Sequence, residues 1–176
     1  KAINFGLIYG MSAFGLTRTT ELTLGESENF VKAYFQQFPG VKRYLDSLRR
    51  LAADQGYVET LLGRRRYFPT LKNERNSQIR SREEREAINA PIQGTAADII
   101  KMAMIKIQHN LPKVSPRSKI ILQVHDELVF EVPEKDLTKV AKFVKETMEK
   151  IIKLKVPIIA EIKAGPSWGE LAKITK

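Results

Sequence analysis

The sequence predicts an α+β fold in which helices come first and short strands enter later in the chain. Three observations support this class. Apolar residues recur at helical spacing through the first 54 residues. The pair Gly63-Arg64 separates two short strand-like runs. Farther along, two runs of β-branched and aromatic residues flank a short polar break at residues 125–127, which predicts a second hairpin.

The first part of the chain divides into helices at its Gly, Ser and Pro residues. The amphipathic spacing indicates that each helix turns one face toward a core. We expect a helix over 1–10, a short helix and turn over 12–24 ending at Gly25, a helix that begins at Ser27 and is broken by Pro39-Gly40, and a helix over 41–54 that Gly56 ends.

The second part mixes strands with two longer helices. Proline cannot donate a backbone hydrogen bond, so we expect Pro91 to kink or interrupt any helix that contains it. We expect a small hairpin of residues 57–62 and 65–69, a loop over 70–78, a long helix over 78–110, a linker at Pro112 and Pro116, a hairpin over 119–132, a helix over 136–152 and a final strand over 156–163.

Composition narrows the class of partner. The chain has 176 residues with 30 Lys and Arg against 20 Asp and Glu, which is a formal charge of +10. Such a surplus favours a polyanion, with nucleic acid first and an acidic membrane surface second. The sequence holds no cysteine, no signal-peptide pattern and no apolar run long enough for a transmembrane helix. We therefore expect no disulfide, no cysteine metal site and no transmembrane helix, and because nucleic acid is the favoured polyanion we expect no membrane partner.

The polar break of the second hairpin is the first candidate site. His125, Asp126 and Glu127 would lie at the tip of two paired strands. Carboxylates on such a tip suit a hard divalent cation, because Mg²⁺ binds oxygen ligands and usually takes one or two from protein. Asp is also common in turns for local reasons, so the tip alone leaves an ordinary turn open.

The first helix carries a row of chemically distinct side chains. Lys1, Phe5 and Tyr9 follow one another at four-residue intervals, which places them on one helix face. A cation suits phosphate and the rings suit sugar and base, while Gly6 and Gly10 permit close approach. Taken alone, the same row also fits a core helix with a lysine extending to solvent.

A second row with the same interval consists of Arg85, Asn89 and Gln93. These side chains can donate to the acceptors that every base pair presents in the minor groove, so the row could follow a duplex without reading its sequence. The basic run that contains Arg64 could hold backbone phosphate. A solvated polar face remains the alternative for both.

Four segments of the chain resemble motifs of family A DNA polymerases, the bacterial DNA polymerase I type, in the order of that family. The chain's ending, Gly-Pro-Ser-Trp-Gly at 165–169, is also similar. The four segments are KAINFGLIYGMS at 1–12, YVETLLGRR at 57–65, NAPIQGTAAD at 89–98 and VHDE at 124–127.

The resemblance implies template-directed addition of deoxynucleotides to a primer 3′-hydroxyl, with two Mg²⁺ ions, primer-template DNA and deoxynucleoside triphosphates as partners. It also implies fingers over 1–55, palm over 56–176 and a cytoplasmic, nucleoid-associated protein. By this resemblance, Lys1 would bind the triphosphate of the incoming nucleotide, Phe5 would lie against its sugar, and Tyr9 and Gly10 would lie near the templating base and the nascent pair. Primer-template DNA would be contacted by Arg85, Asn89, Gln93 and His125. Asp126 would bind metal, and Glu127 would support it.

The same resemblance implies a missing part. The family's second palm aspartate belongs to a pattern like Asp-Tyr-Ser-Gln-Ile-Glu, and this sequence contains none. We therefore expect the chain to be inactive alone and active with an N-terminal segment or subunit that carries this aspartate and the thumb. Such a split could arise from separate genes, protein splicing or proteolysis.

Three other functions are alternatives to a DNA polymerase. A single-subunit RNA polymerase would share the Lys-to-Tyr helix but usually carries Ser at the position of Glu127 and lacks Phe at that of Phe5. A non-catalytic duplex-binding module would keep the groove contacts, although it would have no need of Asp126 or Lys1. A metal phosphohydrolase would require more histidine ligands than His125 and His109 supply.

Overall fold

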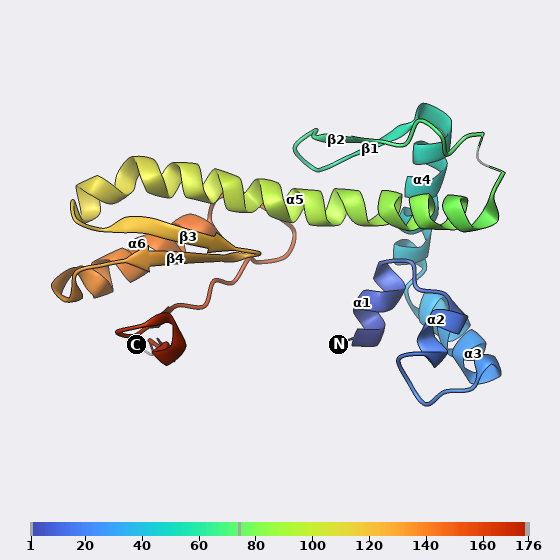
Figure 1. Cartoon of the computed structure of the whole chain (residues 1–176), viewed down its shortest axis with the longest axis horizontal. Helices are drawn as coiled ribbons and strands as arrows, with labels where there is room; N and C mark the ends of the chain where they lie inside the picture. The colour runs from blue at the N-terminus through green and yellow to red at the C-terminus, as the bar shows by residue number, and fades with distance from the viewer. Residues whose placement is uncertain (1, 74, 175–176) are drawn as a thin grey trace. The chain divides into compact units, whose positions relative to one another are not determined.

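The computed structural model describes residues 2–73 and 75–174 and confirms the α+β class (Figure 1). The chain forms two compact units that divide between Thr95 and Ala96, within one long helix. The first unit contains four helices, a hairpin and the start of the long helix, and the second contains the rest. Among the described residues, no helix is both long enough and apolar enough to cross a membrane.

Four helices open the first unit: α1 (Ala2–Ile8), α2 (Ala13–Thr17), α3 (Leu24–Gln37) and α4 (Pro39–Gln55). The Ser12 hydroxyl caps α2 by accepting from the Gly15 amide. Gly56 ends α4 as predicted, because its φ of 77° is the left-handed conformation that glycine adopts without strain.

The predicted start of α3 is wrong. The helix begins three residues before Ser27, and Gly25 lies inside it rather than ending the preceding segment. A capping box decides the boundary: the Thr23 hydroxyl accepts from the Glu26 amide, and the Glu26 carboxylate accepts from the Thr23 amide at 2.8 Å. Ser27 is fully buried in the first turn instead of capping it.

The break between α3 and α4 is also narrower than predicted. Phe38 alone joins the two helices, and Pro39 is the first residue of α4 rather than part of an interruption. Proline suits this position because a helix leaves its first amide without an intrahelical acceptor.

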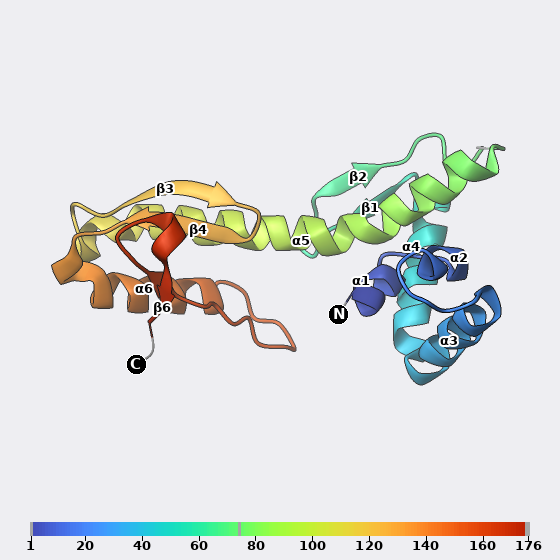
Figure 2. The same cartoon turned by 60° about the horizontal axis from the view of Figure 1, so that its bottom comes forward.

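A small hairpin follows α4, as the sequence predicts. Strands β1 (Tyr57–Glu59) and β2 (Arg65–Tyr67) pair antiparallel, with Tyr57 opposite Tyr67. Figure 2 shows this hairpin beside the first half of helix α5. The two share one buried cluster with α4, which holds Leu48, Ala52, Val58, Phe68, Leu71 and Ala87.

Helix α5 (Ser77–Val114) runs through Pro91 without interruption and is longer than the expected 78–110. Pro112 lies inside its last turns instead of in a linker. A proline inside a helix costs about 3 kcal/mol. Packing on both sides of Pro91 offsets this cost, because Ile88 is buried before it and Ile107 after it.

The second unit contains the other predicted hairpin. Strands β3 (Lys119–Val124) and β4 (Glu127–Glu131) pair antiparallel around a two-residue turn, with an irregularity between Ile120 and Leu122. A short 3₁₀ turn, η1 (Glu134–Asp136), leads into α6 (Leu137–Glu149), which is slightly shorter than the predicted 136–152. Side chains of α5, α6 and the hairpin share the core of this unit.

A buried polar network joins the ends of three elements in the second unit. The Ser118 hydroxyl donates to the Ser115 hydroxyl, which donates to the Asp136 carboxylate at 2.6 Å. Lys139 pairs with the same carboxylate. The Ser115 bond and then the Lys139 bond hold the pKa of Asp136 below its usual value. The network ties the end of α5 to the base of the β3–β4 hairpin.

The predicted strand over 156–163 is wrong. Only Lys163–Ala164 forms a strand, β5, which pairs with β6 (Ala172–Lys173) across a short 3₁₀ turn, η2 (Trp168–Glu170). The preceding residues are apolar yet exposed, with Val156 at 67% and Ile159 at 77%. A strand pattern becomes a strand only when a neighbour pairs with its backbone. The Ile162 carbonyl accepts from the Ile174 amide, but residues 156–161 pair with no strand of the described chain.

Candidate nucleic-acid interface

Helix α1 presents two aromatic rings on one face. Phe5 and Tyr9 stack with ring centroids 6.1 Å apart and an interplanar angle of 24°. Phe5 remains 47% exposed, whereas Leu7 is buried on another face of the helix. The third member of the predicted row, Lys1, lies outside the described residues. The rings therefore form an accessible stacking surface rather than part of the core.

The end of α1 packs directly on α5. Gly10 has a φ of 80°, and a Cβ atom built on it would lie 3.2 Å from Arg85 Cγ and 3.3 Å from Ile88 Cδ1. Glycine is suited to this position both for its left-handed backbone and for the narrow space. The contact joins the ring-bearing helix to the residue that opens the predicted duplex-contact row.

That row lies along α5 at intervals of one turn. Arg85 and Gln93 are exposed, and Asn89 between them is partly buried. The Asn89 Oδ1 atom is buried and has no hydrogen-bond partner among the described residues. An unpaired buried acceptor is costly, so this atom differs from the exposed side chains of Arg85 and Gln93 on either side.

A pocket of about 170 Å³ lies between the β1–β2 hairpin and α5. Arg64 lines it from the hairpin and Gln93 lines it from the helix, so two predicted DNA-binding residues share one cavity. The other residues that line it are Val58, Thr60, Arg65, Arg66, Ala90 and Gly94.

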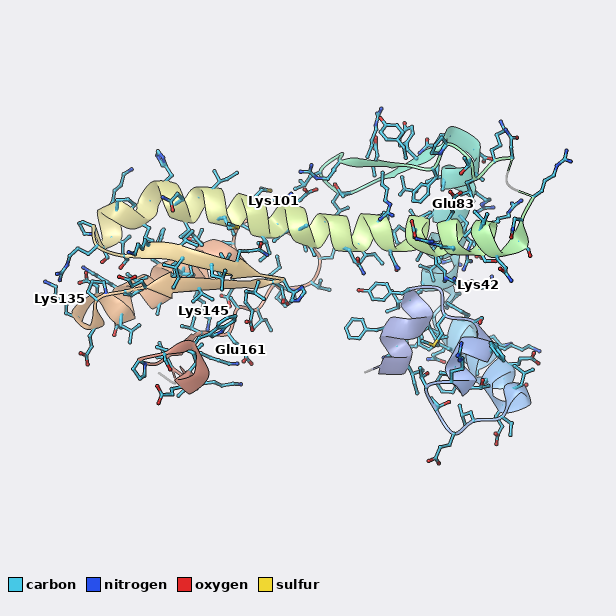
Figure 3. The ribbon with its side chains drawn as sticks, viewed as in Figure 1. Lys42, Glu83, Lys101, Lys135, Lys145 and Glu161 are labelled. Carbon is cyan, nitrogen blue, oxygen red and sulfur yellow. The ribbon has the colours of Figure 1, made fainter. Side chains whose placement is uncertain are left out.

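Carboxylates hold two arginines of the basic run. Arg65 Nε donates to Glu59 at 2.7 Å, and this bond raises the pKa of the guanidinium. Arg66 donates to Glu86 of α5, also at 2.7 Å. Figure 3 labels Glu83, one turn before Glu86, whose carboxylate accepts from the Thr70 hydroxyl at 2.8 Å. The Arg66–Glu86 and Thr70–Glu83 contacts attach the hairpin and the following loop to the first turns of α5, whereas the Arg65–Glu59 pair lies within the hairpin.

The tip of the β3–β4 hairpin carries the remaining predicted residues. His125 and Asp126 form the two-residue turn, and all three polar side chains, Glu127 included, are exposed. His125 has a φ of 52°, a left-handed conformation that is uncommon outside glycine. Gln123 supports it by donating to the His125 carbonyl. Backbone strain of this kind often persists where a functional side chain must be aimed.

The tip offers oxygen donors that suit a hard cation. Asp126 and Glu127 are adjacent carboxylates, and Mg²⁺ prefers oxygen ligands of this kind. Among the described residues, no three His, Cys, Asp or Glu side chains come together in a group that could hold a metal ion. The tip therefore fits part of a metal site.

The predicted residues thus belong to two units. Phe5, Tyr9, Gly10, Arg64, Arg85, Asn89 and Gln93 lie in the first, where α5 meets both α1 and the hairpin. The second unit holds His125, Asp126 and Glu127. Sequence reasoning missed the bond from the Leu61 amide to the Thr95 hydroxyl, which joins the hairpin turn to α5 across 34 residues. No spacing rule connects residues that far apart.

Comparison with known proteins gives consistent matches. A model described as DNA polymerase family A matches residues 1–170. DNA polymerase I of Streptococcus pneumoniae serotype 4 is 49% identical over 170 residues, which are 97% of this chain and 19% of that protein. DNA polymerase I of Geobacillus stearothermophilus is 45% identical over 168 residues, covering 96% of this chain and 19% of the relative.

A solved structure is similar along most of the chain. It is the POL domain of Pol1 from M. smegmatis in a complex with DNA primer-template and dNTP. The similarity has a TM-score of 0.84 at 45% sequence identity and covers 89% of this chain and 27% of that one. The chain thus spans about a fifth of the length of the curated relatives described above.

Proposed function

The chain belongs to DNA polymerase family A, as its motifs predicted, and we propose that it supplies the fingers and part of the palm of a DNA-directed DNA polymerase. We assign residues 1–55 to the fingers and 56–176 to the palm. The observation that carries the proposal is the contact between Gly10 and Arg85. It joins a ring-bearing helix, suited to a nucleotide, to a row of donors suited to duplex DNA.

The exposed face of α1 is proposed to bind the incoming deoxynucleoside triphosphate. Lys1 would meet its phosphates as a point charge. The Phe5 ring would lie against the sugar, where its exposed, stacked arrangement with Tyr9 offers an apolar surface. Tyr9 and Gly10 would border the templating base, and the absence of a side chain at Gly10 leaves room for the nascent pair.

Primer-template DNA is proposed to lie along α5. Arg85, Asn89 and Gln93 share one helix face and donate to acceptors that all four base pairs present, which suits a polymerase that must copy any sequence. Arg64 would hold a backbone phosphate beside Gln93, because both line one pocket. His125 would contact the primer end from the tip of the other hairpin.

The carboxylates of that tip are proposed to hold metal. Asp126 would be a ligand of Mg²⁺ and Glu127 would support it. Two bound ions supply activation of the primer 3′-hydroxyl and stabilisation of the leaving pyrophosphate. The ions need a further carboxylate, which we assign to an upstream segment with the second palm aspartate. The absence of a pattern like Asp-Tyr-Ser-Gln-Ile-Glu from this sequence supports the need for such a segment.

Primer extension with and without the upstream segment tests the proposal. The assay uses Mg²⁺, deoxynucleotides and this chain, alone or mixed with a fragment that supplies the upstream palm and thumb. We expect extension only in the mixture. Extension by the chain alone would contradict the requirement for a partner. Retained duplex binding without extension in either case would favour a non-catalytic duplex-binding module, and preference for ribonucleotides would favour an RNA polymerase.

A further inference from the structure

The turn between β1 and β2, residues 60–64, has a partner for every backbone amide. The five bonds run from Thr60 to the Arg64 carbonyl, from Leu61 to the Thr95 hydroxyl, from Leu62 and Arg64 to the Thr60 hydroxyl, and from Gly63 to the Thr60 carbonyl. Four of these bonds are internal to the turn. Of these five amide bonds, the Leu61 bond is the one that leaves the turn and attaches it to α5.

The Thr95 hydroxyl makes two hydrogen bonds, one within α5 and one to the turn. It donates to the Pro91 carbonyl at 2.6 Å, which leaves its oxygen oriented to accept from the Leu61 amide at 3.0 Å. Thr95 is 8% exposed and Leu61 is 70% exposed, so the bond lies where the buried face of α5 meets an exposed turn. A hydroxyl at this position is therefore part of the contact between helix and turn.

Gly94 brings the two elements close together. A Cβ atom built at this position would lie 2.6 Å from Thr60 Cγ2, a distance that requires Thr60 to move. The glycine therefore allows the turn to approach α5 near enough for the Leu61–Thr95 bond. Gly94 and Thr60 also line the pocket that Arg64 and Gln93 share.

We propose that Thr95 is a positioning residue that sets Arg64 against Gln93 for duplex binding, by holding the 60–64 turn on α5. The inference rests on the proposed function, because it assumes that these two side chains bind DNA. Thr95 itself touches no DNA in this account. The effect travels through the Leu61–Thr95 bond to the turn, whose internal bonds transmit the displacement to Arg64.

Equilibrium binding of a primer-template duplex by the full chain provides the first test. Thr95→Val keeps the shape and removes the hydroxyl, whereas Thr95→Ser keeps the hydroxyl. We expect Thr95→Val to weaken binding by about fivefold, the equivalent of one hydrogen bond, and Thr95→Ser to bind within about twofold of the unaltered chain. Equal binding by all three chains would overturn the positioning role.

Thr147→Val is the matched control. Thr147 is 6% exposed in α6, and its hydroxyl donates to the carbonyl four residues earlier at 2.8 Å, as that of Thr95 does. It accepts no amide from another element among the described residues. We expect its variant to bind duplex unchanged. A loss equal to that of Thr95→Val would show that a helix hydroxyl, rather than the attached turn, controls binding.

A double-mutant cycle with Arg64→Ala separates positioning from general weakening. If Thr95 acts through Arg64, Thr95→Val should have little further effect in the Arg64→Ala chain. Independent, multiplicative losses would overturn the proposal.

Amide hydrogen exchange gives a readout that does not depend on DNA. We expect the Leu61 amide to lose protection in Thr95→Val and in Gly94→Ala, while amides of the α5 core keep theirs. Unchanged protection of Leu61 would overturn the attachment. By contrast, failure of the unaltered chain to bind duplex, with Leu61 protected, would overturn the proposed function and leave the attachment standing.

Discussion

The two hairpin turns of the molecule are held in different ways. The 60–64 turn satisfies its amides internally and through Thr95, and Gly63 takes its left-handed position at a φ of 80°. The 125–126 turn places a histidine in the left-handed region and leaves its polar side chains exposed. One turn has the residue that its backbone favours, and the other has a histidine where the backbone favours glycine. This difference agrees with the roles proposed for the two turns, DNA binding for the first and metal binding for the second.

The largest effect should follow from Asp126→Ala at the second turn. Losing a ligand of the proposed metal site removes several kcal/mol of transition-state stabilisation, so we expect the rate of primer extension to fall by at least about 100-fold. The assay uses the chain mixed with its upstream segment at saturating DNA. Glu131→Ala, at the other end of β4, serves as a control that should extend normally. Normal extension by Asp126→Ala would refute the metal role.

A core substitution tests whether the two turns depend on separate cores. Ile107 is fully buried in the second unit, so Ile107→Ala should lower the free energy of unfolding by about 2–5 kcal/mol. Because the core around Leu48 lies in the first unit, we expect exchange protection near Leu61 to decrease less than protection of β3 and β4. Equal loss in both units would indicate one cooperative core.

Removing the glycine from the first turn and introducing one into the second sharpens the comparison. Gly63→Ala should destabilise the chain by about 1 kcal/mol, because alanine is strained at a φ of 80°. His125→Gly should do the reverse and raise stability by up to about 1 kcal/mol, because it relieves strain at a φ of 52°. Thermal unfolding measures both. We expect His125→Gly to bind primer-template DNA more weakly despite its higher stability, and a stable variant with full binding would contradict the assigned role.

The smallest effect concerns pH and the base of the β3–β4 hairpin. The pKa of Asp136 is lowered mainly by the Ser115 bond and then by Lys139, so its carboxylate stabilises the fold above the ordinary aspartate pKa of about 3.9. That contribution is lost as the pH falls through the lowered pKa. We expect Ser115→Ala to unfold more easily than the unaltered chain at neutral pH, with the difference shrinking in acid. A difference that grows in acid would reverse the assigned sign.

Local chemistry made much of the fold predictable. Gly56 and Gly63 occupy left-handed positions that few other residues adopt, and the hairpins around 63–64 and 125–126 formed where strand runs met turn residues. The start of α3 was missed because the reciprocal bonds of Thr23 and Glu26 favour an earlier cap than Ser27. Pro112 failed as a boundary because packing of α5 outweighs one missing backbone bond.

Contacts between residues far apart in the sequence could not be predicted from sequence patterns. Helical spacing places Arg85, Asn89 and Gln93 on one face, but it says nothing of the hairpin that brings Arg64 beside Gln93. No sequence pattern indicated the role of Thr95, because its partner, the Leu61 amide, lies 34 residues away. The apolar pattern over 156–163 predicted a strand, yet strand formation depends on a paired neighbour that residues 156–161 lack in the described chain.

Single-turnover primer extension by the reassembled enzyme, measured across DNA concentrations, tests the division of roles between the two turns most directly. Arg64→Ala should weaken duplex binding and leave the rate at saturating DNA unchanged. Asp126→Ala should abolish that rate and leave duplex binding nearly unchanged. If Arg64→Ala instead lowers the saturated rate while Asp126→Ala weakens binding alone, the assignment of DNA holding to the first turn and chemistry to the second is wrong.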